Sequence, residues 1–152
     1  MSESSRIVSA ERRIAAPAAD IFELIADPAQ QPRWDGNDNL SEGAPDQRVH
    51  AVGEIFVMTN LGDRRRENHV VEFVEARLIA WKPALPGEAP FGQLWRWELE
   101  PQDDGSTLVR HSYDWTDLDE IAEPERAERA RNTTPEKLRS SIDRLAALAE
   151  RE

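Results

Sequence analysis

His111 and Tyr113 are the residues of this chain whose types and spacing best suit chemistry. They stand two positions apart in a segment of alternating polar and apolar residues, so we expect both on one face of a strand. A histidine could remove a proton beside a ketone, and a tyrosine could donate a hydrogen bond to the developing enolate oxygen. The alternative, which the sequence favours, is that both rings fill the core with their polar atoms hydrogen-bonded.

These two residues belong to a predicted hairpin, whose strands cover 95–99 and 109–115 and whose polar turn covers 102–106. One face of this hairpin gathers large rings with polar tips, and its expected members are Trp95, Trp97, Leu99, Val109, His111, Tyr113 and Trp115. Such rings often line a cavity, although an aromatic core is the simpler alternative. The sequence therefore indicates a ligand cavity more firmly than any particular ligand.

His69 is expected on a neighbouring strand, with the same parity as Val71 and Phe73. It could meet His111 across the cavity, and a carboxylate could then complete a metal site. The spacing matches no metal-binding motif, and the chain has no cysteine. We therefore expect neither a metal ion nor a cofactor.

Arg12 falls on the apolar parity of the first predicted strand, where a buried arginine needs a partner. That partner could be a ligand carboxylate or phenolate, or an internal acid such as Glu54 or Glu72, and structural pairing is favoured. Asp35 could lie at the mouth of the cavity or close a turn, and the turn is favoured.

Residues 64–66 form the only basic run, Arg-Arg-Arg. The favoured interpretation is a solvated strand end, and the alternative is a contact for an acidic partner.

Size and charge limit the possible functions of the chain. Its 152 residues predict one domain, 1–152, with a core of its own. The net charge of −11 argues against nucleic acid and anionic membrane surfaces as partners. No apolar run suits a membrane span or a signal peptide, and the lack of cysteine suits a reducing compartment. We expect a cytoplasmic monomer or homodimer.

The order of predicted elements is that of an α+β domain with an antiparallel sheet. We expect strands at 6–15, 53–60, 64–75, 78–82, 95–99 and 109–115, a weak edge strand within 37–52, and two short helices after the first strand. Residues 117–132 read as a mobile or solvated helical segment. A long final helix, capped by Thr133 or Thr134, carries the apolar stripe Leu138, Ile142, Leu145, Leu148 and Ala149. Whether loop 83–90 or segment 117–132 forms a lid is left open.

Four pieces of the chain resemble a known superfamily in their order and spacing: 13–17 with 21–28, 32–35, 70–73 with 78–81, and 97–109 with the helix around 141–145. The chain resembles the START-like (Bet v 1-like) helix-grip superfamily, also called SRPBCC, and within it the bacterial polyketide cyclase/dehydrase-type proteins. This resemblance implies a strongly curved seven-stranded antiparallel sheet that wraps around the C-terminal helix and encloses an apolar cavity. It implies no universal catalytic motif.

The resulting hypothesis is that a small hydrophobic molecule, similar to a lipid, a polyketide or an aromatic compound, binds in this cavity. The first alternative is a cofactor-free cyclase or dehydratase that uses His111 and Tyr113, and the second is a stress-linked or regulatory interaction protein. The expected cavity residues are Trp34, Phe56, Met58, His69, Phe73, Trp81, Trp95, Trp97, His111, Tyr113, Trp115, Leu138 and Ile142.

Overall fold

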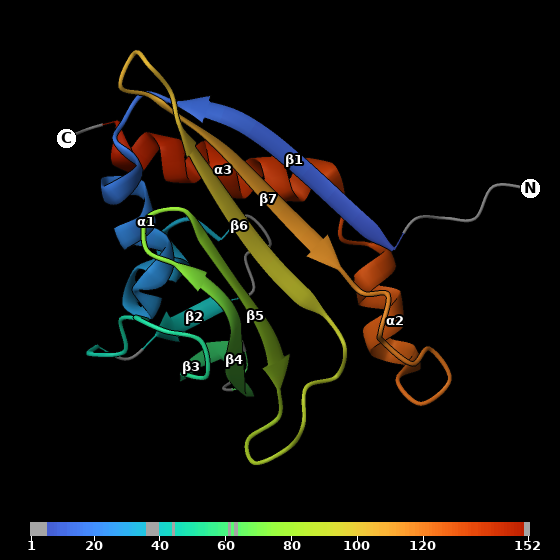
Figure 1. Ribbon diagram of the computed structural model, residues 1–152. Helices are drawn as coiled ribbons and strands as arrows, with labels where there is room; N and C mark the ends of the chain where they lie inside the picture. The colour runs from blue at the N-terminus through green and yellow to red at the C-terminus, as the bar shows by residue number, and fades with distance from the viewer. Residues whose placement is uncertain (1–5, 36–39, 44, 61, 63, 151–152) are drawn as a thin grey trace, which may run out of the picture.

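A computed structural model describes residues 6–35, 40–43, 45–60, 62 and 64–150 of the chain (Figure 1). Its elements are, in order, β1 (Ile7–Ile14), α1 (Ala18–Ala26), the 3-10 helix η1 (Pro28–Arg33), β2 (Leu40–Gly43), β3 (Ile55–Asn60), β4 (Arg64–Val74), β5 (Leu78–Ala84), β6 (Leu94–Pro101), β7 (Thr107–Asp114), α2 (Pro124–Arg131) and α3 (Pro135–Ala149).

All the strands join one antiparallel sheet in the order β1-β7-β6-β5-β4-β3-β2. The C-terminal helix α3 lies against β1 and β7, and α1 packs against α3 and β6 (Figure 1). This single antiparallel sheet with its C-terminal helix confirms the predicted α+β class. No helix in the described part of the chain is both long enough and apolar enough to span a membrane.

The segment after β1 forms one α-helix followed at once by a 3-10 helix, where two short helices were expected. Asp27 separates the two and caps the second, because its side chain accepts a hydrogen bond from the backbone N–H of Ala29 at 3.2 Å. Pro32 lies inside η1 and cannot donate a backbone hydrogen bond, which favours a short 3-10 turn over a regular α-helix.

Helix α3 begins with Thr134 as its cap. The Thr134 hydroxyl accepts a hydrogen bond from the backbone N–H of Lys137 at 3.3 Å, so Thr134 and not Thr133 fills this position. The predicted apolar stripe is the buried side of the helix, except that Leu148 is only partly buried. The stripe packs α3 onto the concave side of the sheet and so fixes the position of its N-terminal turns.

Strand β4 changes its inward face part-way along its length. A bulge opposite β5 between Val70 and Glu72 adds a residue to β4, so the alternation of side chains shifts there. Asn68 and Val70 are buried before the bulge, and Phe73 packs against the core after it. His69 therefore does not share a face with Phe73, and the prediction from simple alternation was wrong.

Helix α2 and the loop before β6 are packed against each other and against the end of β7. Phe91 packs beside a small core cluster that includes Trp115 and Ala127. Gly92 has a φ of +124°, and a Cβ there would lie 2.5 Å from the backbone of Asp117. The segment expected to be solvated or mobile thus forms an attached helix.

Candidate functional site

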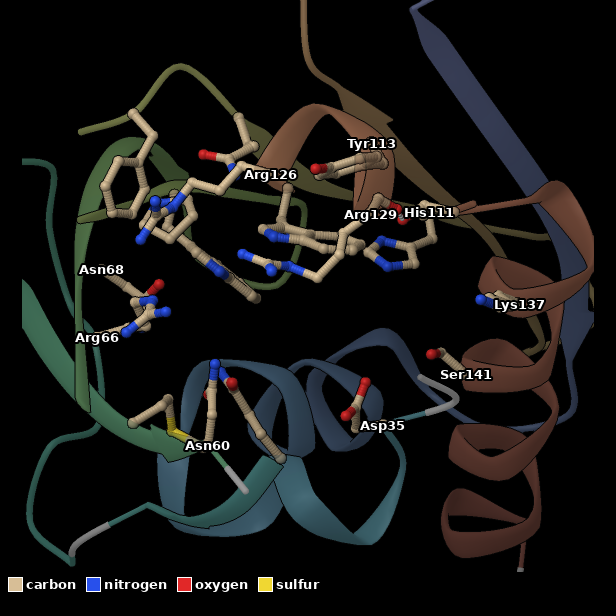
Figure 2. Close-up of a pocket in the computed structure, with 18 of the residues that line it drawn as sticks. Asp35, Asn60, Arg66, Asn68, His111, Tyr113, Arg126, Arg129, Lys137 and Ser141 are labelled. Carbon is tan, nitrogen blue, oxygen red and sulfur yellow. Dashed lines mark hydrogen bonds between the residues drawn. The ribbon is translucent and has the colours of Figure 1, made fainter. Parts of the chain in front are cut away.

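A pocket of about 480 Å³ lies between the sheet and helices α2 and α3 (Figure 2). Its wall includes side chains from β3 to β7, from both helices, and from the end of η1. The lining residues are Gln31, Trp34, Asp35, Met58, Asn60, Arg64, Arg66, Asn68, Trp81, Pro83, Phe91, Gln93, Trp95, Trp97, His111, Tyr113, Arg126, Arg129, Asn132, Thr133, Lys137 and Ser141.

One wall of the pocket is built of indole rings from neighbouring strands. Strand pairing places Trp81 opposite Trp95 and positions Trp97 one inward step further along β6. Trp34, from the end of η1, meets Trp97 edge to face, with ring centroids 5.2 Å apart. The Trp34 indole N–H donates to the carbonyl of Leu24 at 2.8 Å, which holds its ring in place.

His111 is a buried, neutral side chain on β7 that lies beside the tryptophans of β6. Its Nδ1 lies 3.0 Å from the carbonyl oxygen of Arg96, which can only accept, so Nδ1 carries the proton and Nε2 keeps its lone pair. The ring stacks on Trp97, with centroids 3.7 Å apart. Burial lowers the pKa of His111 to about 3, opposed by the hydrogen bond to Arg96. The side chain is therefore a weak base at neutral pH.

Tyr113 lies one inward step along β7 from His111, opposite Trp95. The ring centroids of Tyr113 and Trp95 are 4.2 Å apart. Burial raises the pKa of Tyr113 far above its ordinary value, although the nearby charge of Arg129 lowers it somewhat. Tyr113 thus stays protonated and can act as a hydrogen-bond donor toward the pocket.

Five cationic side chains line the pocket, although the chain as a whole is strongly acidic. Arg64 and Arg66 come from β4, Arg126 and Arg129 from α2, and Lys137 from α3. Burial lowers the pKa of Arg66, and so does repulsion from the charges of Arg126, Arg129 and Arg64. Figure 2 shows Arg66, Arg126 and Arg129 entering the same space. This side of the pocket therefore concentrates positive charge.

Most of this charge has no acidic partner among the residues that the structure describes. Arg126 pairs with Glu123 at 2.6 Å, and its guanidinium lies 3.7 Å from the ring centroid of Phe91. In the described part of the chain, no carboxylate forms an ion pair with Arg66, Arg129 or Lys137. Two guanidinium groups and one ammonium group therefore keep their charge available to the pocket.

The expected cavity residues divide into those at the pocket and those in the surrounding core. The pocket is lined by Trp34, Met58, Trp81, Trp95, Trp97, His111 and Tyr113. Those outside its lining are Phe56, His69, Phe73, Trp115, Leu138 and Ile142.

Each residue outside the lining is placed by packing that alternation could not reveal. Phe56 meets Trp81 edge to face at 5.2 Å, and Phe73 meets Phe22 of α1 at 5.6 Å. Trp115 lies beneath α2. Leu138 and Ile142 are fully buried in the core on the inner side of α3, and His69 lies on the face of β4 that points away from the pocket.

The charged candidates agree with expectation only in part. Arg12 is partly buried and forms the favoured structural ion pair, but its partner is Asp143 of α3 at 3.0 Å and not Glu54 or Glu72. Asp35 is buried and lines the pocket, which makes it more than a turn residue. The run 64–66 is not simply solvated, because Arg64 and Arg66 line the pocket.

The residues that the sequence analysis missed are mainly the polar side of the pocket. Arg64, Arg66 and Asn68 alternate along β4 and lead into buried Val70, a period-two signal that could have placed them inward. Arg126 and Arg129 on α2, and Lys137 and Ser141 on α3, carry no comparable signal in the sequence. Only the tertiary packing of the two helices turns these side chains toward the sheet. Among the described residues, no group of three His, Asp or Glu side chains could hold a metal ion.

Comparison with known proteins assigns the chain to a family. Residues 5–150 match the family model described as polyketide cyclase / dehydrase and lipid transport. The chain belongs to this family. It is therefore a member of the START-like, or SRPBCC, superfamily, as its sequence motifs indicated.

The similar proteins are bacterial and differ in length. Uncharacterized protein Rv0088 of Mycobacterium tuberculosis is 26% identical over 110 residues, which are 71% of this chain and 47% of that protein. This chain thus spans about half the length of the curated relatives that it matches.

Two solved structures share the fold. Protein MLL2253 of Mesorhizobium loti has a TM-score of 0.68 at 17% identity, with 95% of this chain and 97% of that chain covered. The di-domain ARO/CYC StfQ from the steffimycin biosynthetic pathway has a TM-score of 0.61 at 23% identity, with 95% and 44% covered.

Proposed function

We propose that this protein binds a small molecule with an apolar, ring-containing body in the pocket between its sheet and α2. The observation that carries this proposal is the pocket wall, which contains four of the five tryptophans, Trp34, Trp81, Trp95 and Trp97. Its volume of about 480 Å³ lies within the usual range for small-molecule sites, roughly 300–1,000 Å³. Membership of a family described by cyclase, dehydrase and lipid-transport activities supports the same function class.

The alternative of a cofactor-free cyclase or dehydratase is supported by one feature, since His111 and Tyr113 line the same pocket. Binding without chemistry fits the electrostatics better, because a base whose conjugate acid has a pKa of about 3 removes a carbon-bound proton poorly. The two side chains suit neutral hydrogen bonding to a ligand. A regulatory role, the cytoplasmic location and the monomeric or homodimeric state remain predictions from the sequence.

The proposal is tested with N-phenyl-1-naphthylamine, a neutral probe whose emission rises in apolar surroundings. We expect saturable binding and quenching of tryptophan emission. Trp95→Ala should weaken binding roughly tenfold, because it removes one ring of the wall. Ile121→Ala is the matched control, since Ile121 is 94% exposed and lies outside the pocket. If the folded wild-type protein does not bind the probe, the proposed function is wrong.

A further inference from the structure

The pocket contains charge that its apolar wall does not require. Arg66 and Arg129 enter it from β4 and α2, which are far apart in the sequence (Figure 2). Neither forms an ion pair with any carboxylate among the described residues. Like charges gathered around one space repel each other, and Arg66 feels this repulsion from Arg126, Arg129 and Arg64.

The lining of the pocket contains one acidic residue, Asp35. Asp35 lies beyond the end of η1, across the pocket from Arg66 and Arg126 in Figure 2. Its backbone carbonyl accepts a hydrogen bond from Arg144 at 2.6 Å, which ties this stretch of chain to α3. Among the described lining residues, Arg66 and Arg126 thus lie on the side of the pocket away from its one carboxylate, that of Asp35.

We propose that the natural ligand is an apolar acid, whose carboxylate binds Arg66 and Arg129 while its body lies against the tryptophan wall. This inference rests on the proposed binding function and adds the chemical class of the ligand. Guanidinium groups present planar forks of N–H donors that match the two oxygens of a carboxylate, and such charge-assisted hydrogen bonds are the strong ones. Lys137 adds a third positive charge at the first turns of α3.

Two ligands of the same shape can isolate the contribution of the charge. 2-Naphthoate and 2-naphthamide share one ring system, and only the first is an anion near neutral pH. Each is added to protein loaded with N-phenyl-1-naphthylamine, and the displacement of the probe gives the affinity. We expect 2-naphthoate to bind at least about tenfold more tightly, as a charge-assisted contact implies.

Variants of β4 and α2 then locate the anion. Arg66→Gln and Arg129→Gln should each reduce the preference for 2-naphthoate to about threefold or less, while affinity for 2-naphthamide stays the same. Arg65→Gln is the matched control, because it removes the same charge from the exposed face of the same strand. An equal loss of preference in Arg65→Gln would show that only the overall charge matters, which contradicts the inference.

The possible failures can be told apart. If the protein binds N-phenyl-1-naphthylamine but 2-naphthoate displaces it no better than 2-naphthamide, the anionic ligand is wrong and the apolar pocket stands. If 2-naphthyl phosphate displaces the probe and 2-naphthoate does not, the carboxylate is wrong. If the probe itself does not bind, the proposed function fails first.

Discussion

Replacing His111 with asparagine should flatten the dependence of stability on pH in the acid range. The folded protein holds His111 with a pKa of about 3, against about 6.5 in an unfolded chain. Well above pH 6.5 neither state binds a proton at this residue. Below it, the unfolded state takes up the proton first, so the free energy of unfolding falls as pH decreases.

The size of this effect follows from the gap between the two pKa values. Each pH unit between 6.5 and 3 costs about 1.4 kcal/mol of stability from this group. From pH 7.5 to pH 4.5 the loss is therefore about 3 kcal/mol, a large share of the stability of an ordinary domain. The contribution of His111 is fully present above pH 6.5 and is lost as the pH falls toward 3.

Urea unfolding at pH 7.5, 6.5, 5.5 and 4.5, followed by tryptophan emission, measures this dependence. Asparagine is chosen because its amide N–H can replace the Nδ1–H that donates to Arg96. The fall in stability between pH 7.5 and 4.5 should be about 3 kcal/mol smaller in His111→Asn than in the wild-type protein. His50→Asn, which changes an exposed loop residue, should keep the wild-type slope.

A His111→Asn variant with the wild-type slope would refute this reasoning. It would mean that the folded protein accepts a proton at His111 almost as readily as the unfolded chain does. The imidazole would then be solvated within the pocket and strong enough as a base to make the cyclase alternative the better one. Direct NMR titration of the wild-type ring distinguishes these cases, because a pKa near 6 would be seen in the folded state.

Two further predictions concern charge and capping. Arg66→Gln should raise the melting temperature of the ligand-free protein more than Arg65→Gln does, because Arg66 lines the pocket and is repelled there by Arg126, Arg129 and Arg64. An equal or smaller rise contradicts the picture of a repulsive charge cluster. Thr134→Ala should lower the free energy of unfolding, measured with urea, by about 1 kcal/mol, because it removes the helix cap. Thr133→Ala should leave this cap intact. A larger loss in Thr133→Ala than in Thr134→Ala would assign the cap to Thr133.

The hairpin shows what alternation can predict from sequence. Strict alternation along β6 and β7 was enough to put Trp95, Trp97, His111 and Tyr113 on one face, and the strand register brings them opposite each other in pairs. The terminal helix was equally readable, since its apolar residues recur every three or four positions, as on one face of an α-helix. Trp115 shows the limit of this reasoning, because it follows the same alternation but lies beyond the strand, where α2 covers it.

The placement of His69 and the side of the pocket formed by α2 could not be predicted in the same way. The bulge between Val70 and Glu72 leaves no mark in the sequence, and it reverses the parity on which the placement of His69 depended. The position of α2 depends on two small residues of its own buried side, Ala127 and Ala130, which pack in the core. A short helix rich in charge and poor in large apolar residues gives almost no signal of which side faces the protein.

The bulge and α2 together explain why the pocket has two chemically different sides. Before the bulge, β4 directs Arg66 and Asn68 inward, and after it the strand returns to apolar contacts with α1. Helix α2 then places Arg129 above the same space, where it approaches Tyr113 and Arg66. Arg66 is only half-exposed at its inward position and loses part of its solvation there, whereas Arg129 stays exposed to solvent. Under our proposal, a bound anion would neutralise these side chains, and the ligand would then account for this arrangement.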